Sequence, residues 1–339
     1  ITAILNEIIE GSKKTNKEAK KLWLPNIPPI ILVDNLIKKY NINFSDSIKA
    51  VIGEVDIPAE QKQDVLVYDL LKDGNCSIFG TDGLENEMII HSLLYSLFTH
   101  YNSELVNFYV IDYGSSNFRR YNKIPHCGGI VLPDEEEKYK NLFIMIDKEL
   151  NKRKDKLSNL GKTFESYIKD DISFTFLFLL NMPLILVILN QFDNINQADN
   201  NLYEYLPKLV KDSEQYGVVF ILNGSTESSI TSKVRQSIKT SFCLKLKEDY
   251  DYGSILGIRG KIRPRDVYGK GVCLIESMQE FQTASIVENS DKVNEYIFKI
   301  ADKLNTSKFK PAKKIPELPK QITEEVAGEN YSLDKFLIG

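Results

Sequence analysis

The chain has 339 residues, of which 42% are hydrophobic and 27% charged, and its formal net charge is -4 at pH 7. This composition is typical of one large or two ordinary globular domains with a sizeable core, and it argues against a disordered chain. The mild negative charge gives no electrostatic footprint for nucleic acid or an anionic membrane, and the four scattered cysteines show neither disulfide density nor zinc-ligand spacing.

The first 45 residues are expected to form a segment that precedes the main domain. Apolar side chains at helical spacing in residues 1–11 predict a short helix that ends at Gly11. Residues 23–29 contain three prolines, and because proline restricts its own backbone and that of the preceding residue, we expect an extended strap across the domain. No methionine precedes Ile1, which suggests that the sequence is a piece of a longer chain.

Strands and helices then alternate and predict one α/β domain over residues 46–304. Apolar runs predict strands at 51–56, 65–70, just before residue 80, and at 106–111, 184–189, 218–223, 241–246, 271–275 and 281–287. Helical patterns begin near residue 86 and cover 134–156 and 201–216. This order is typical of a mainly parallel central sheet flanked by helices.

Two of these segments have a second interpretation. Residues 172–189 are apolar enough to suggest a membrane-spanning helix, but polar residues and Pro183 interrupt the run, so we favour a buried strand after the proline. The helix at 134–156 has acidic residues in its first turn and basic residues, Arg153 among them, near its end. These charges complement the helix dipole, and we expect them to be solvated.

The loop that follows the short strand has the frame of a phosphate-binding loop without its chemistry. In the intact pattern, Gly-x-x-x-x-Gly-Lys-Ser/Thr, backbone amides cradle the phosphates, the lysine reaches the outer phosphates and the hydroxyl holds magnesium. Glu85, Asn86 and Glu87 occupy the last three positions here. The loss of the lysine removes charge-assisted contacts worth roughly 1.5–3 kcal/mol apiece, so ATP and Mg²⁺ are expected to bind weakly or not at all. The candidate cofactor-binding residues are Gly80, Thr81, Asp82, Gly83, Leu84, Glu85, Asn86, Glu87 and Met88.

A nucleotide-hydrolysing domain also needs a buried strand that ends in acidic residues, which position magnesium and the attacking water. The candidate strand, 184–189, is followed by Asn190 and Gln191, so two carboxamides stand where carboxylates are expected. Asp193 replaces them only if the strand register differs by a few residues. Without an acid, general-base assistance of about 10²- to 10⁴-fold is lost, and no intact catalytic residue is predicted.

Three further sets of polar residues have ordinary structural alternatives. Asn223 ends a predicted strand where a polar sensor of the γ-phosphate is expected, although it is equally suited to cap a turn. Arg235 is either an arginine finger that reaches a neighbouring subunit or a solvated arginine. His91, His100 and His126 lack mutual metal-ligand spacing, so core or surface roles are favoured and no metal site is predicted.

Taken together, the sequence resembles the FtsK/SpoIIIE-type ATPase domains, and among them the EssC/EccC proteins of type VII secretion. The resemblance covers about 260 residues in the family's order and implies a RecA-like P-loop NTPase fold. It rests on these residues: Trp23-Leu24-Pro25; Gly53-Glu54-Val55-Asp56 with Pro58, Ala59 and Gln61; the loop at Gly80; Phe108-Tyr109 and Ile111-Asp112-Tyr113-Gly114; Ile124-Pro125-His126-Cys127-Gly128-Gly129; Gly257; Gly269-Lys270-Gly271; and Phe281-Gln282.

The resemblance implies a membrane-anchored bacterial chain with several such domains in tandem on the cytoplasmic side, this one being the second. Residues 305–339, rich in lysine and proline and ending Leu337-Ile338-Gly339, then form the extended linker to a following domain. The implied partners are neighbouring ATPase domains, other secretion-machine subunits, small helical secreted substrates and, in the full machine, a homo-hexamer.

Three functions follow from this resemblance, and the sequence leaves them open. The first is a degenerate ATPase-like module that scaffolds or regulates its neighbours and docks substrates in an apolar pocket. The second is a weakly active ATP-binding or hydrolysing domain that powers export. The third, a DNA-translocase module, is disfavoured by the net charge of -4, and no nucleic acid is expected as a partner.

Overall fold

The computed structural model describes residues 7, 9–11, 24–170, 182–199, 201–257, 263–274 and 278–317. Most of the predicted N-terminal helix, Trp23, the start of the apolar run at 172–181 and the linker beyond residue 317 lie outside this part of the chain. No helix within the described ranges combines the length and the apolar character needed to cross a membrane.

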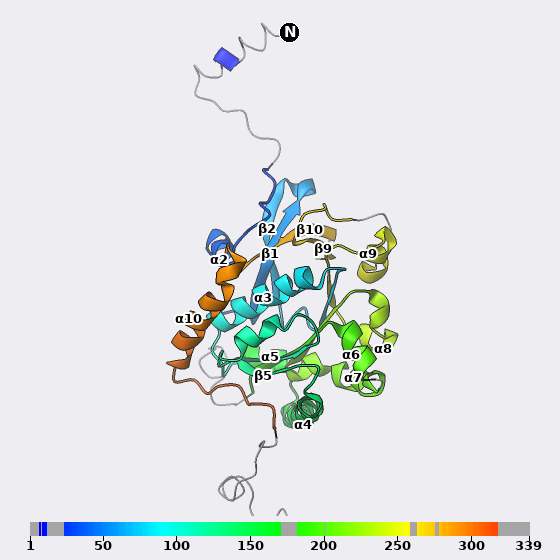
Figure 1. Cartoon of the computed structure of the whole chain (residues 1–339). Coiled ribbons are helices and arrows are strands. Elements are labelled where there is room, and N and C mark those ends of the chain that lie inside the picture. The colour runs from blue at the N-terminus through cyan, green and yellow to red at the C-terminus, as the bar shows by residue number, and fades with distance from the viewer. Residues whose placement is uncertain are drawn as a thin grey trace, which may run out of the picture.

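A ten-stranded sheet runs through the centre of the molecule in the order β2-β1-β10-β9-β8-β3-β7-β6-β4-β5 (Figure 1). The strands β8, β3, β7, β6, β4 and β5 are parallel, whereas β9, β10, β1 and β2 extend the sheet by antiparallel pairing. The fold class predicted from the sequence is therefore confirmed. The strands are β1 (Lys49–Ile57), β2 (Lys62–Asp69), β3 (Cys76–Phe79), β4 (Val106–Asp112), β5 (Cys127–Val131), β6 (Leu184–Asn190), β7 (Val218–Gly224), β8 (Thr240–Cys243), β9 (Lys270–Leu274) and β10 (Met278–Thr283).

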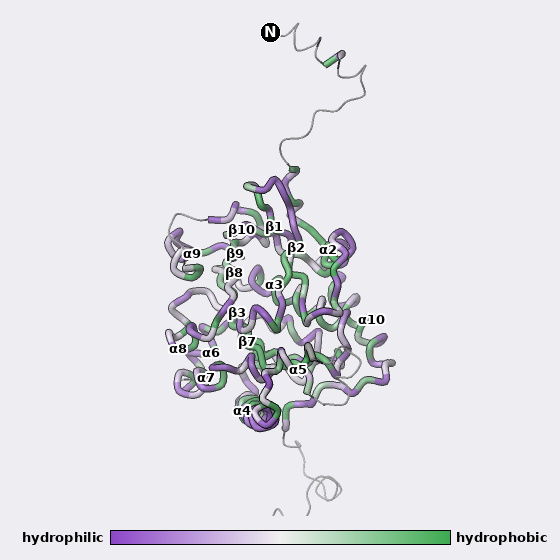
Figure 2. Tube along the Cα trace, turned by 180° about the vertical axis from the view of Figure 1, so that it is seen from behind, coloured by the Kyte–Doolittle hydropathy of each residue, from purple (hydrophilic) through white to green (hydrophobic). Residues whose placement is uncertain are grey.

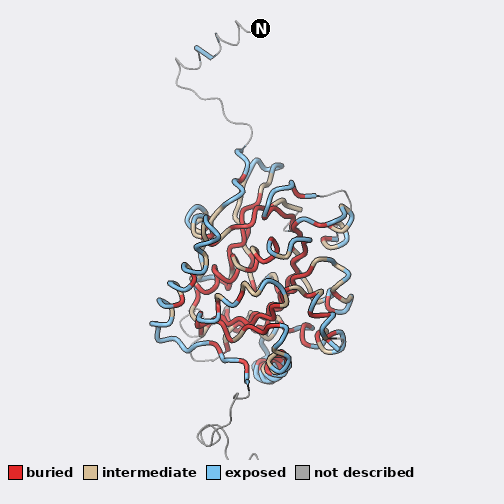
Figure 3. Tube along the Cα trace, viewed as in Figure 1, coloured by how far each residue is buried: buried red, intermediate tan, exposed pale blue. Residues whose placement is uncertain are grey.

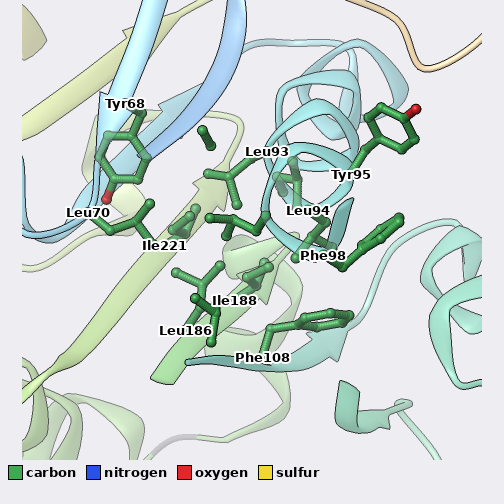
Figure 4. Packing of buried hydrophobic residues seen from close by; sticks show 14 of the residues in the cluster. Tyr68, Leu70, Leu93, Leu94, Tyr95, Phe98, Phe108, Leu186, Ile188 and Ile221 are labelled. Atoms are coloured by element: carbon green, nitrogen blue, oxygen red, sulfur yellow. The ribbon is translucent and has the colours of Figure 1, made fainter. Parts of the chain in front are cut away.

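Helices cover both faces of the sheet, and each face has its own apolar cluster. Helices α3, α2 and α10 pack on one face and α4, α6, α7 and α9 on the other, so the strands between them are buried (Figure 3). Figure 4 shows Leu93, Leu94 and Phe98 of α3 lying against Leu186 and Ile188 of β6. The helices are α2 (Val33–Tyr40), α3 (Gly83–His100), α4 (Glu136–Leu160), α5 (Phe164–Asp170), α6 (Phe192–Ala198), α7 (Leu202–Val210), α8 (Ser232–Arg235), α9 (Asp249–Leu256) and α10 (Val293–Asn305).

Several predicted boundaries need correction. The helix expected from about residue 86 begins one turn earlier, at Gly83. The helix expected to reach residue 216 ends at Val210, because the backbone of Lys211 is extended and that of Asp212 is left-handed. The strand expected at 281–287 ends at Thr283, since Ser285 leaves β10 to donate its amide to Ile31 O.

Arg153 is not part of a solvated charge run, which corrects the prediction for α4. Its side chain is 1% exposed, and its guanidinium donates to the carbonyl oxygens of Pro183, Tyr216 and Gly217 at 2.8–3.1 Å. Glu149, one turn earlier, accepts from Nε at 2.8 Å. Helix α4 therefore uses this arginine to satisfy carbonyl groups at the start of the neighbouring strands β6 and β7.

Two extended segments lie against the domain. At one end, the amide of Gln63 donates to Pro25 O and that of Gln282 to Pro29 O, so residues 24–30 run from β2 to β10 across the β1–β2 hairpin (Figure 2). At the other end, residues 310–317 follow the β5 edge, where Ile315 N donates to Gly128 O. A Cβ at Gly129 would lie 2.6 Å from Ile315 Cδ1, so the glycine permits this close approach.

Candidate functional site

The loop after β3 closes onto its own helix. Asp82 is the N-cap of α3, and its Oδ1 accepts from Leu84 N at 2.9 Å and Glu85 N at 3.3 Å. The N-terminus of a helix is ordinarily the place where backbone amides bind a phosphate. Here the carboxylate of the chain itself takes that position. Thr81 N donates to Lys245 O at 2.9 Å, so this amide is also turned away from the centre of the loop.

The interior of the loop is filled by two carboxamides. Asn86 is 1% exposed, and its Nδ2 donates to Gly80 O at 3.0 Å and Gly224 O at 3.4 Å. A Cβ at Gly80 would lie 2.1 Å from Asn86 Oδ1, and one at Gly83 would lie 2.1 Å from Gln191 Nε2. Both glycines are thus needed to admit neighbouring amide groups, and the space that would cradle phosphates is occupied by side chains.

Side chains from α3 and from the ends of β4, β6 and β7 form one buried network. Asn190 Nδ2 donates to Glu87 Oε1 and to Asp112 Oδ1, each at 2.9 Å, and Asn190 Oδ1 accepts from Asn223 Nδ2 at 2.5 Å. All four side chains are at most 1% exposed. Ser115 Oγ donates to Glu87 Oε2 at 2.6 Å. The structure therefore brings the predicted Glu87, Asn190 and Asn223 together, and hydrogen bonds between their own side chains connect them.

The network has more acceptors than donors. Asp112 Oδ2 and Asn223 Oδ1 are buried and accept no hydrogen bond from the described residues. Burial raises the pKa of Asp112, because an ionised carboxylate loses its hydration there, and the nearby Glu87 adds to the effect. Burial also raises the pKa of Glu85, whose Oε1 accepts from Gly269 N at 2.5 Å. The residues present do not fit magnesium-ATP, because Asn86 stands in place of the lysine and Glu87 in place of the hydroxyl.

Three other candidates lie outside this network. Arg235 pairs with Glu227, on the loop before α8, and is half exposed. Asp193 Oδ2 accepts from Ser225 N at 2.7 Å and does not replace Asn190. His91 bonds to the hydroxyl of Tyr121, and burial lowers the pKa of His91 to about 3. Within the described ranges, no three His, Cys, Asp or Glu side chains form a group that could hold a metal ion.

Asp112 is the member of the network that sequence reasoning did not assign. It ends β4, and β4 pairs in parallel with β6 so that Asp112 lies opposite Asn190. The available signal was an acidic residue directly after an apolar strand, since the carboxyl ends of parallel strands meet at one edge of the sheet.

A groove of about 900 Å³ lies between α4 and α7, away from the loop. Tyr139 OH donates to Asp199 Oδ2 at 3.0 Å and lies 2.9 Å from Tyr205 OH, and these groups form a polar patch in the floor. Ile144 is 52% exposed. Apolar and aromatic side chains alternate with an equal number of charged or polar ones in the lining of the groove. The first set is Tyr113, Tyr139, Phe143, Ile144, Ala198, Tyr205 and Leu209, and the second is Glu136, Lys140, Asp147, Lys148, Asp199, Asn201 and Lys208.

Comparison with known proteins identifies the relatives of this chain. The sequence model of the FtsK/SpoIIIE family matches residues 48–251. The type VII secretion system protein EssC of Staphylococcus aureus (strain MRSA252) is 26% identical over 331 residues, which are 95% of this chain and 22% of that protein. The ESX secretion system protein EccC of Geobacillus thermodenitrificans is 25% identical over 258 residues, 76% of this chain and 17% of that protein. The chain thus spans only a small part of these relatives.

Solved structures show the same fold. EssC (ATPases 2 and 3) from Geobacillus thermodenitrificans superimposes with a TM-score of 0.79 at 23% identity and covers 91% of this chain and 58% of that one. Thermomonospora curvata EccC (ATPases 2 and 3) in complex with a signal sequence peptide superimposes with a TM-score of 0.71 at 18% identity. The match covers 90% of this chain and 56% of that one.

Proposed function

Because the chain belongs to the FtsK/SpoIIIE family, we propose that it is an ATPase-like module of a type VII secretion motor that scaffolds or regulates neighbouring ATPase domains without hydrolysing ATP. The buried network of Glu87, Asn190, Asp112 and Asn223 is the observation that supports this proposal most directly. Its hydrogen bonds replace the contacts that a motor domain would make to magnesium and phosphate. The module then acts through binding energy that shifts domain contacts.

The setting of the module is part of the same proposal. We infer a membrane-anchored bacterial parent chain, with this module on the cytoplasmic side between other ATPase domains and in contact with other secretion subunits. A homo-hexamer is proposed for the full machine. The seating of residues 310–317 along β5 favours a scaffolding role, because a following domain would be tethered close to this one.

The first test is magnesium-dependent ATP binding, measured by titration calorimetry. The unaltered chain is expected to give no such binding, because Asn86 and Gln191 fill the loop and Glu87 repels phosphate. The Asn86→Lys, Glu87→Ser variant is expected to bind with micromolar affinity, roughly -8 kcal/mol.

Titration of both proteins without magnesium is the control. Micromolar binding of magnesium-ATP by the unaltered chain, with turnover, would favour the weakly active export ATPase instead.

In cells, deleting the module while sparing an active neighbour should impair secretion, and normal secretion would contradict the scaffolding role. Salt-dependent DNA binding would revive the translocase alternative.

We further propose that the groove between α4 and α7 docks a helical segment of a secreted substrate. Its volume of about 900 Å³ and aromatic lining suit an amphipathic helix, and a structural neighbour is described in complex with a signal sequence peptide. Tyrosines at the floor combine apolar contact area with hydroxyl groups that can bond to the peptide.

Ile144→Glu is expected to weaken the binding of a signal-sequence peptide about 10-fold or more, because it places a charge in an apolar contact. Fluorescence anisotropy with a labelled peptide measures the change. Leu160→Glu is the matched control, since Leu160 ends the same helix, is 51% exposed and does not line the groove. Equal weakening by both variants would rule out the groove as the docking site.

A further inference from the structure

A second pocket, of about 420 Å³, opens beside the degenerate loop. We call it the lysine pocket and define it by Thr81, Asp82, Glu85, Lys245, Arg263 and Lys270. Its volume lies in the range of sites that hold small organic ligands. It includes the outer side of the loop, whereas the phosphate cradle on the inner side is filled by Asn86 and Gln191.

The topology of the sheet places Lys270 at this pocket. β9 is antiparallel to β8, which is parallel to β3, so the first residue of β9 lies at the end of the sheet where the loop begins. Neighbouring strands are about 4.8 Å apart, which puts Lys270 roughly 10 Å from the loop strand, and both Lys270 and the loop line the same pocket. Gly269, at φ +76°, donates its N–H to Glu85 Oε1 at 2.5 Å and fixes this turn against α3.

Lys270 is a buried cation with incomplete partners. Its side chain is 3% exposed, and its Nζ makes no hydrogen bond with any described residue. The nearest carboxylate oxygen is Glu280 Oε1, at 3.3 Å. That oxygen already accepts from Arg265 Nε at 2.7 Å, and Arg265 Nη2 lies 2.5 Å from it. One carboxylate is therefore shared by two cations, and Lys270 retains capacity to donate to a ligand.

The other cations of the lysine pocket are held only by exposed ion pairs. Lys245 Nζ lies 2.7 Å from Asp266, and Arg263 Nη1 lies 3.4 Å from Asp249. In both pairs each side chain is about half exposed or more. Exposed ion pairs of this kind contribute little to stability. Either cation can therefore leave its partner and bind a ligand phosphate with little loss of free energy.

The acidic residues of the pocket oppose an anion less than their number suggests. Three carboxylates line the pocket. Asp82 is bonded to the backbone amides of α3, Glu85 is bonded to Gly269 N, and Asp266 pairs with Lys245. Burial raises the pKa of Glu85. Tyr268, 56% exposed at the rim, offers an aromatic face to the rest of a ligand.

We propose that the lysine pocket binds the phosphate of a nucleotide-sized organic phosphate, with Lys270 as the principal cation and Lys245 and Arg263 closing on the ligand. This proposal extends the proposed function, because it gives a module without hydrolysis a ligand to which it can respond. It does not depend on magnesium or on the inner face of the loop.

Titration calorimetry without magnesium tests the proposal with inorganic phosphate, AMP, ADP and adenosine as probes. The phosphate-bearing probes are expected to bind and adenosine to bind far more weakly. Lys270→Gln should weaken ADP binding about 10-fold or more, since it removes a charge-assisted contact. Glu280→Gln should strengthen ADP binding, because it releases the charges of Lys270 and Arg265, and a folding defect would not produce this opposite change.

Lys239→Gln is the matched control for the change in charge. Lys239 precedes β8 and pairs with Glu214 at the opposite end of the sheet, so ADP binding should be unchanged. Thermal unfolding of each variant confirms that it is folded. The proposal is overturned if no phosphate-bearing probe binds at millimolar concentration, if adenosine binds as well as ADP, or if Lys270→Gln and Lys239→Gln weaken binding equally. None of these outcomes bears on magnesium-dependent ATP binding or on secretion, so the proposed function is tested separately.

Discussion

Replacing Asn190 with aspartate is expected to destabilise the domain by about 3–5 kcal/mol at pH 7, although it restores the acid that an ATPase motif requires at this position. Asn190 Nδ2 donates to Glu87 Oε1 and Asp112 Oδ1 at 2.9 Å each. An aspartate oxygen at that point would face two carboxylates without a donor. Like charges about 3 Å apart repel by roughly 5 kcal/mol at an effective dielectric constant of about 20.

The penalty should depend on pH with a definite sign. Burial and repulsion would raise the folded-state pKa of the introduced carboxyl above its unfolded value of about 3.9, so the folded state binds more protons and loses stability as pH rises. Below the unfolded pKa the added carboxyl is protonated in both states and can donate to a neighbour. The difference in unfolding free energy between the variant and the unaltered chain should therefore shrink from pH 7 towards pH 4, as measured by urea unfolding at each pH.

Two variants sharpen this test. Asn190→Asp combined with Glu87→Ser should recover most of the lost stability, because it removes one of the facing carboxylates. Asn194→Asp is the matched control: Asn194 is exposed, lies four residues later and should change stability by less than about 1 kcal/mol. If Asn190→Asp is as stable as the unaltered chain, the cluster accommodates a further charge, and the argument for a closed, self-satisfied site fails.

The expected behaviour of Asn190 shows why Asn190 and Glu87 must be considered together. Asn190 and Glu87 are 103 residues apart, yet each satisfies the other, so the carboxamide at the end of β6 and the carboxylate in α3 form one structural unit. Restoring one motif position alone leaves the other as an obstacle. Scaffold and catalytic chemistry are therefore separable in this fold only by coordinated changes.

The sequence was sufficient to predict the fold class, because the order of strands and helices follows from local patterns. Apolar runs predicted β4, β6 and β7, and glycine spacing placed the loop at Gly80. The start of α3 was also available in principle, since Asp82 followed by Glu85 at the third helical position is a capping signature. Only the structure shows that the carboxylate of Asp82 caps this helix at the position where a phosphate would bind.

Contacts between distant segments could not be predicted in this way. The pairing of Asp112 with Asn190 depends on the register of β4 and β6. The bond from Gly269 N to Glu85 joins residues that are 184 positions apart in the sequence. Without knowledge of this contact, nothing in the sequence distinguishes Lys270 from the other lysines. The burial of Arg153 also could not be predicted, because a buried arginine and a solvated one have the same local sequence pattern within a basic run. Only the carbonyl groups that it reaches separate the two.

Arg153→Ala is expected to destabilise the domain by about 3–5 kcal/mol, because it leaves buried polar groups without partners. The guanidinium donates to three backbone carbonyls and pairs with Glu149. Arg153→Lys should recover only part of the loss, since an ammonium lacks the planar fork that reaches several acceptors. Urea unfolding measures these differences, and Lys154→Ala, on the exposed side of α4, should stay within about 0.5 kcal/mol of the unaltered chain.

The same substitution bears on substrate docking, because α4 is one wall of the groove and Arg153 anchors that helix to the residues that precede β6 and β7. Under conditions where the variant remains folded, signal-sequence peptide binding should still weaken, although no residue of the groove has changed. A variant that is destabilised but binds the peptide normally would show that the groove does not depend on this anchor. A variant within about 1 kcal/mol of the unaltered chain would show that the three carbonyls find other donors and that the position of α4 is set by its apolar face alone.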